Sequence, residues 1–121
     1  MMENNFGKLG NTQEEALATV EPMVSGILKA QDDGDYNAFC SFFEDGLREQ
    51  ITEQDFMNNQ QSIQSTMGNL AEKEFLTTLQ RNGMVGLLYK CRFDGSKDDF
   101  IVTITIDDKK EPLKASGIWI S

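Results

Sequence analysis

The spacing of apolar residues changes near Met67 and Gly68: before this point they recur at helical intervals, and after it they alternate. Intervals of three and four residues are typical of an amphipathic helix, and an interval of two is typical of a half-buried strand. The pattern therefore predicts helices first and an antiparallel sheet afterwards, which is an α+β domain.

The first helix is predicted to start at Thr12, because Thr12-Gln13-Glu14-Glu15 has the form of a capping box. An apolar stripe follows from Ala16 to Leu28, and Pro22 within it favours a kink or a restart of the helix. We expect Gly34 to end this helix with a positive φ angle, and Asp35 to cap the next one.

The second helix is short and aromatic, with an apolar face formed by Tyr36, Phe39, Phe42 and Phe43. The third is expected to start at a Thr52 cap and to run to Met67, with Phe56 and Gln60 on its inner face. Three helices therefore precede the sheet.

Four strands are predicted, at 74–79, 85–93, 100–106 and 113–119, joined by short turns into a meander. Each has one larger apolar set at alternate positions, which we expect to face the helices. In the second strand this set includes Tyr89 and Cys91, and in the fourth it is Leu113, Ala115, Gly117 and Trp119. The opposite, outer face then exposes Ile101, Ile118 and Ile120, which predicts a homodimer through that face.

Three features of the sequence are the basis of a resemblance to a known family. They are the helix stop Gly34-Asp35-Tyr36-Asn37-Ala38-Phe39, the helix from Thr52 to Met67 with Gly68 after it, and a last strand that reads Ser116-Gly117-Ile118-Trp119. With these features the chain resembles the nuclear transport factor two-like (cystatin-like) superfamily, in its small prokaryotic branch of unknown function. The resemblance covers essentially the whole chain. It implies a cone in which three helices pack on a curved four-stranded meander. In such a cone, relatives bind small apolar molecules or carry out lyase and isomerase chemistry.

The chain has 121 residues, which fits one domain over residues 11–121 with a frayed lead over residues 1–10. Its net charge of −9 repels phosphate backbones and anionic lipid, so neither nucleic acid nor membrane is an expected partner. The first residues show neither a basic leader nor a long apolar run, and we therefore expect a cytoplasmic protein.

A binding pocket for a small apolar ligand is predicted inside the cone. Its lining is expected to be Phe43, Phe56, Gln60, Tyr89, Cys91 and Trp119. The alternative without a ligand is an accessory or dimerisation domain whose cone is filled by side chains.

Catalysis is the less favoured reading, because the chain has no histidine to move protons near neutral pH. An enzyme of the isomerase or lyase type would have to use Tyr89 with a buried carboxylate. No cofactor motif is present, since the glycines form neither a dinucleotide-binding nor a phosphate-binding loop.

Residues Asp33 to Glu44 match a calcium loop at several ligand positions, which leaves calcium binding as a second alternative. Ala38 stands where such a loop needs glycine for its sharp turn. The aromatic stripe would also be broken, and a capped helix is favoured there over a metal site.

Overall fold

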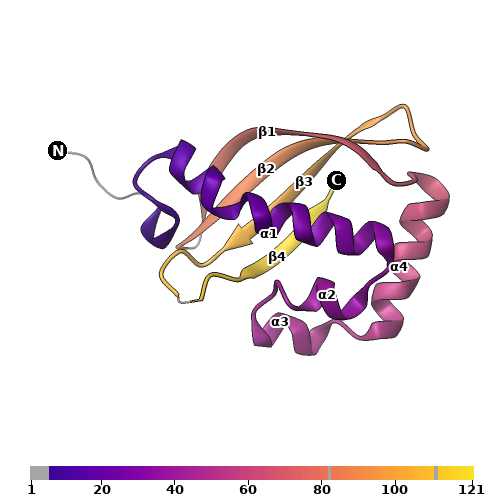
Figure 1. The fold of residues 1–121 in the computed structure, drawn as a ribbon, viewed down its shortest axis with the longest axis horizontal. Coiled ribbons are helices and arrows are strands. Elements are labelled where there is room, and N and C mark those ends of the chain that lie inside the picture. The colour runs from indigo at the N-terminus through magenta and orange to yellow at the C-terminus, as the bar shows by residue number, and fades with distance from the viewer. Residues whose placement is uncertain (1–5, 82, 111) are drawn as a thin grey trace.

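A computed structural model describes residues 6–81, 83–110 and 112–121 (Figure 1). A 3-10 turn, η1, spans Gly7–Leu9. The α-helices are α1 (Gln13–Asp33), α2 (Tyr36–Cys40), α3 (Asp45–Gln50) and α4 (Glu53–Thr66). The strands are β1 (Leu70–Arg81), β2 (Met84–Phe93), β3 (Asp99–Ile106) and β4 (Ala115–Ile120). The predicted α+β class and the four-stranded antiparallel meander are confirmed, whereas the count of three helices missed the short helix α3.

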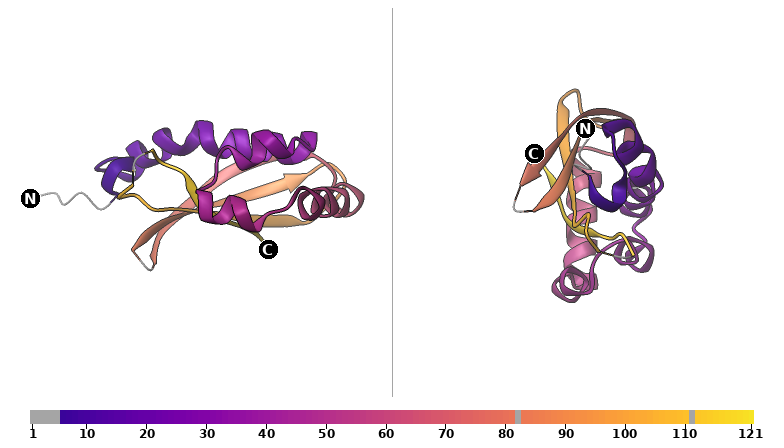
Figure 2. Two further views of the ribbon diagram at one scale, coloured as in Figure 1. Left: turned by 90° about the horizontal axis from the view of Figure 1, so that it is seen from below. Right: turned by 90° about the vertical axis from the view of Figure 1, so that its left-hand side faces the viewer.

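Helix α1 lies across one side of the sheet, and no described helix covers the other side, as the two side views in Figure 2 show. Strands follow one another in the order β1-β2-β3-β4, and every neighbouring pair is antiparallel. We call the side toward the helices the inner face and the opposite side the outer face. No described helix is both long and apolar enough to cross a membrane.

Helix α1 is held at its start by two side chains. The Thr12 hydroxyl accepts a hydrogen bond from the Glu15 amide at 3.1 Å, as expected. The Glu15 carboxylate, however, accepts from the Asn11 amide at 3.1 Å rather than from Thr12. The helix then runs through Pro22 as one element of 21 residues, so no second helix start is needed there.

The turn between α1 and α2 agrees with the sequence. Gly34 is left-handed with φ of 70°, and its backbone N–H closes the end of α1. The Asp35 carboxylate accepts from the Ala38 amide at 3.1 Å and caps α2. This fixed turn places Phe39 and Cys40 in the core.

The segment before α1 is partly ordered, although the sequence placed it in a frayed lead. Leu9 is buried, and its carbonyl accepts a hydrogen bond from the Thr19 hydroxyl at 2.8 Å. The Lys8 amide donates to the Asp108 carbonyl at 2.7 Å, which ties this segment to the connection between β3 and β4. Residues 1–5 of the expected lead lie outside the described residues.

The inner faces of β2 and β3 are the apolar sets that alternation predicts. Their buried members are Val85, Leu87, Tyr89, Cys91, Phe93, Val102, Ile104 and Ile106. A shift of one residue in either strand would turn the whole set toward solvent, so burial of the inner face fixes the register.

Strand β4 departs from the expected alternation. Ala115 pairs with Ile106, but Gly117 pairs with Thr105, so Ser116 is an extra residue that forms a β-bulge. Beyond the bulge the faces are exchanged: Ile118 and Ile120 pair with inward residues of β3 and pack against the core. Trp119 pairs with Thr103 on the outer face and is 57% exposed. The predictions of an inward Trp119 and of outward Ile118 and Ile120 are therefore wrong.

The cap of α2 gives a first test. Replacing Asp35 with alanine leaves the Ala38 amide without its acceptor, and we expect the free energy of unfolding to fall by about 1 kcal/mol. Chemical denaturation measures this change. Asp98→Ala is the matched control, because that exposed carboxylate is in no hydrogen bond of the described structure. Equal stability of both variants would contradict the capping role.

Candidate functional site

The exposed large hydrophobic side chains of the described chain all belong to the sheet. They are Leu76, Leu79, Ile101 and Trp119. Pairing places Leu79, Ile101 and Trp119 on the outer face, while Leu76 is the extra residue at a second bulge in β1. An apolar surface collected on one face usually marks an interaction site.

This outer face is hollowed near β4. A groove of about 520 Å³ is lined by Leu79, Met84, Gly86, Thr103, Thr105, Ser116 and Trp119. Leu79, Gly86, Thr105 and Gly117 are successive cross-strand partners and form one row across the sheet. Gly86 has no side chain, and the groove follows from that gap in the row.

Trp119 forms one wall of the groove. A β-carbon added at Gly117 would lie only 2.5 Å from the Cη2 atom of the indole, so the ring lies directly over this glycine. Any larger residue at position 117 would push the indole away from the sheet. Gly117 therefore sets the position of the tryptophan ring.

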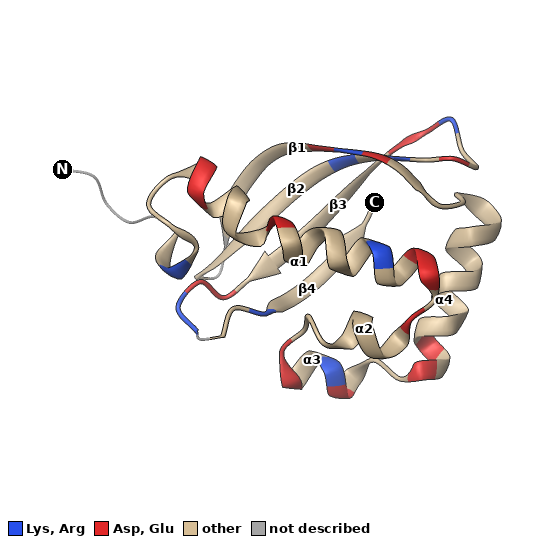
Figure 3. Ribbon diagram, viewed as in Figure 1, with Lys and Arg blue, Asp and Glu red and all other residues tan. Residues whose placement is uncertain are grey.

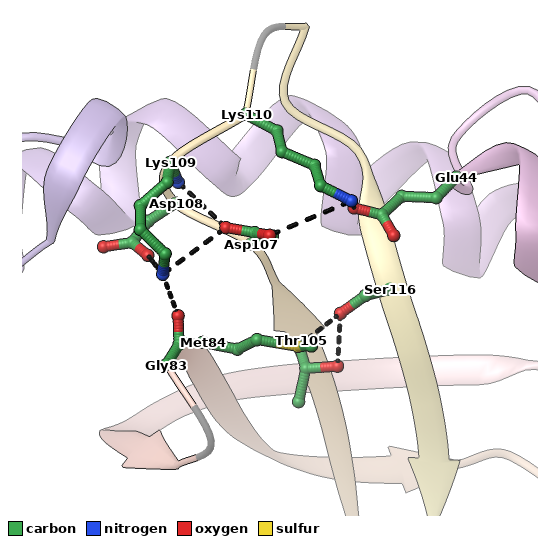
Figure 4. Close-up of polar contacts among 9 residues, drawn as sticks. All are labelled: Glu44, Gly83, Met84, Thr105, Asp107, Asp108, Lys109, Lys110 and Ser116. Carbon is green, nitrogen blue, oxygen red and sulfur yellow. Dashed lines mark hydrogen bonds and ion pairs between the residues drawn. The ribbon is translucent and has the colours of Figure 1, made fainter.

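The end of the groove near β4 is polar (Figure 4). The hydroxyls of Thr105 and Ser116 are 3.0 Å apart, and Ser116 donates to the Met84 sulfur at 3.2 Å. These contacts join β2, β3 and β4 across the bulge. With Thr103, three hydroxyl-bearing residues therefore line the groove beside its apolar residues, and hydroxyl groups can accept or donate hydrogen bonds to a partner.

Lysines of the connection between β3 and β4 brace this end of the sheet (Figure 4). The Lys109 ammonium donates to the Gly83 carbonyl of the β1–β2 turn and lies 3.5 Å from the Asp107 carboxylate. The Lys110 ammonium lies 3.7 Å from the carboxylate of Glu44, which is the N-cap residue of α3. The Asp107 carboxylate also accepts from the Lys109 backbone amide, and this hydrogen bond lowers its pKa.

Of the six residues predicted to line an inner pocket, four are buried in the core and two lie elsewhere. Phe43 and Phe56 are both buried and are joined through Phe39, whose ring centre is 4.8 Å from each of theirs. Tyr89 and Cys91 are buried on the inner face of β2.

The remaining two predicted residues lie apart from that core. Gln60 lies at the helix junction, where its amide donates to the Asp32 carbonyl at 3.4 Å. Trp119 is on the other side of the sheet, so it cannot line a pocket shared with Tyr89.

Tyr89 has an unusual environment for a buried phenol. Its hydroxyl has no hydrogen-bond partner among the described residues. The Lys73 ammonium lies 5.8 Å from the ring centre and pairs with the Glu21 carboxylate at 2.5 Å. Burial, and the nearby Glu21 charge, raise the pKa of Tyr89 above its ordinary value. The tyrosine–carboxylate hydrogen bond that an isomerase or lyase would require is not formed here.

Cys91 is equally unsuited to catalysis near neutral pH. Burial raises the pKa of its thiol to about 11, and only the Lys73 charge acts in the opposite direction. Since the thiolate is the nucleophilic form, the thiol is inert at neutral pH.

The candidate calcium loop is a capped helix in the structure. The Asp35 carboxylate accepts a hydrogen bond from the Ala38 amide, and Asp33 forms an ion pair with Lys29 at 2.8 Å. Within residues 6–81, 83–110 and 112–121 there is no group of three or more acidic, cysteine or histidine side chains arranged to hold a metal ion.

No family model matches the chain, and no curated protein matches it. The structure of Bd1075 from Bdellovibrio bacteriovorus is similar with a TM-score of 0.52 and 14% identity, over 91% of this chain. This chain spans only 42% of that protein chain. The solution structure of RPA3114, a SEC-C motif containing protein from Rhodopseudomonas palustris, is similar with a TM-score of 0.52 and 9% identity, over 97% of this chain and 98% of that one. At such identities the similarity shows the fold alone.

The contact between Gly117 and the indole can be tested by fluorescence. Gly117→Ala places a methyl group against the ring, so we expect Trp119 emission to shift and stability to fall by about 1–3 kcal/mol. Gly46→Ala is the control, because a β-carbon at Gly46 meets nothing within 4 Å. Unchanged emission in Gly117→Ala would show that the ring does not lie over residue 117.

The Tyr89 hydroxyl can be tested with a matched pair of variants. Tyr89→Phe removes a buried group that has no partner, so stability should stay within about 1 kcal/mol of wild type or rise. Tyr36→Phe removes a 2.5 Å hydrogen bond to the Ile51 carbonyl and should cost about 1 kcal/mol. Chemical denaturation compares the two. A larger loss in Tyr89→Phe than in Tyr36→Phe would mean that the Tyr89 hydroxyl has a partner in solution.

Proposed function

We propose that this domain is a non-catalytic assembly module that pairs with a second copy through the outer face of its sheet. The observation that carries the proposal is the gathering of exposed large hydrophobics on that uncovered face. Burying an aromatic side chain that is 57% exposed, as Trp119 is, contributes about 2–3 kcal/mol per copy.

Charge also supports a second copy as the partner. The chain has twenty acidic and eleven basic residues, and acidic residues are spread along α1, α3 and α4 (Figure 3). The described charged side chains of the outer face are Glu72, Glu74, Lys90, Arg92 and Asp99. Three acidic and two basic groups make this face nearly neutral, so two copies repel one another least when they meet there.

The charges on the outer face are also paired within one molecule. Glu74 lies 3.5 Å from Lys90, and Arg92 lies 3.6 Å from Asp99. They occupy the end of the sheet opposite the groove, where they can form the polar rim of an interface around an apolar centre.

The packing of a helix on one face of an antiparallel meander supports a proposal about the family of this domain. We assign the domain to the nuclear transport factor two-like superfamily, with the sheet curved as a cone around the helices. The helix stop at Gly34 and the Asp35 cap, which formed part of that resemblance, are consistent with this assignment. A cytoplasmic location remains a prediction from the first residues of the sequence, and the absence of nucleic-acid and membrane partners remains a prediction from its net charge.

Binding of a small apolar ligand inside the cone is the second candidate function. One observation favours it: the Tyr89 hydroxyl is buried without a partner and is therefore available to a ligand that carries a hydrogen-bond acceptor. In this version the lining would be Phe43, Phe56, Tyr89 and Cys91, without Gln60 and Trp119, which lie apart from these four.

Sedimentation velocity over a range of concentrations tests self-association. We expect wild type to form a dimer, and Ile101→Glu to be monomeric because it places a charge in the centre of the outer face. Asn59→Glu adds the same charge on the helical side and should still dimerise. A wild-type protein that is monomeric at the highest accessible concentration would refute the proposal.

A further inference from the structure

The outer face offers an exposed aromatic ring and a hollow side by side. The Trp119 indole lies over Gly117 and leaves its other side exposed, and the groove beside it crosses β3 to reach Gly86 on β2. A partner that supplied only an apolar side chain would fill the groove but leave much of the indole exposed. A second copy of the chain supplies both shapes at once, because two-fold interfaces join the same patch on each subunit.

Resting on the proposed assembly, we propose that two copies interlock through Trp119. The indole of each copy enters the groove of the other, over Gly86, and packs against the partner's own Trp119. The near-neutral charge of this face is the reason to choose a second copy over a charged partner, since the chain as a whole carries −9.

The floor of the groove explains why residue 86 matters. A β-carbon at Gly86 would lie 3.7 Å from the Leu79 β-carbon and 3.7 Å from the Thr105 methyl, which are ordinary contacts. A β-carbon at residue 86 therefore fits the strand of a single copy, and β-branched residues are favoured in strands. The methyl groups of a valine would extend from that carbon toward the groove and take up the space that an entering indole needs.

Each chain has a single tryptophan, which gives the proposal a specific signal. Two indoles that pack against each other at stacking distance couple their electronic transitions and produce a paired positive and negative band in the circular dichroism spectrum. Within one copy no such pair exists. We therefore measure this paired band and the dimer fraction on the same samples across a dilution series.

We expect the paired band of wild type to rise and fall with the dimer fraction. Gly86→Val should lose the band and bind its second copy about tenfold or more weakly. Trp119→Phe should lose the band because the chromophore is gone, and a band that persisted in it would overturn the assignment. Gly46→Ala, which alters a glycine outside the groove, should keep both the band and the dimer.

Two other results separate this inference from the proposal on which it rests. A wild-type dimer without the paired band, or a band that survives in folded Gly86→Val, overturns the interlocked tryptophans but leaves the dimer. Wild type that stays monomeric at every concentration overturns both. Gly86→Ala serves as the milder variant if the valine variant does not fold, and it should weaken the dimer in the same direction.

Discussion

Ala115 is held between two backbones, and the outer surface of the sheet depends on this constraint. Its amide donates to the Phe42 carbonyl at 2.8 Å, and its carbonyl accepts from the Glu44 amide at 3.0 Å. On its other side Ala115 pairs with Ile106 of β3. With the start of β4 fixed by both neighbours, the extra residue Ser116 has to be absorbed as a bulge, and every side chain beyond it changes face. The bulge is therefore the reason that a tryptophan points to solvent while two isoleucines close the core.

The two faces of the sheet consequently serve different purposes. The inner face is built from β-branched and aromatic side chains that pack against α1 and fix the register. The outer face combines an exposed indole that lies over Gly117, two glycines in one row and a rim of paired charges. Glycine weakens a strand, and one reason for a glycine inside a strand is that another group approaches its backbone closely. The row that contains Gly86 and Gly117 has two such positions. In our account the close approach is made by Trp119, from its own chain at Gly117 and from the partner at Gly86.

The sequence predicted the helix caps and the inner rows of β2 and β3 because these depend on local chemistry and on strict alternation. Asp35 and Thr52, for example, cap through short-range hydrogen bonds that any chain with this pattern can form. Helix α3 was missed because Asp45–Gln50 is only six residues long and buries none of them. Trp119 was misplaced because alternation was carried through Ser116 and Gly117. The glycine there was the available signal for a bulge, and Ile118 with Ile120 offered the larger apolar set. The groove could not be predicted, since it requires the alignment of Leu79, Gly86 and Thr105 from three strands.

Nuclear Overhauser contacts of the single indole test the bulge most directly. We predict contacts from the Trp119 ring to the Gly117 α-protons and the Thr105 side chain, and contacts from Ile118 to core residues. These contacts should be present at concentrations where the protein is monomeric, because they arise within one copy. Contacts from the Trp119 ring to Phe43 or Phe56 instead would mean that β4 alternates without a bulge. That result would contradict the outer groove, the interlocked tryptophans and the assignment of the uncovered face as the interface.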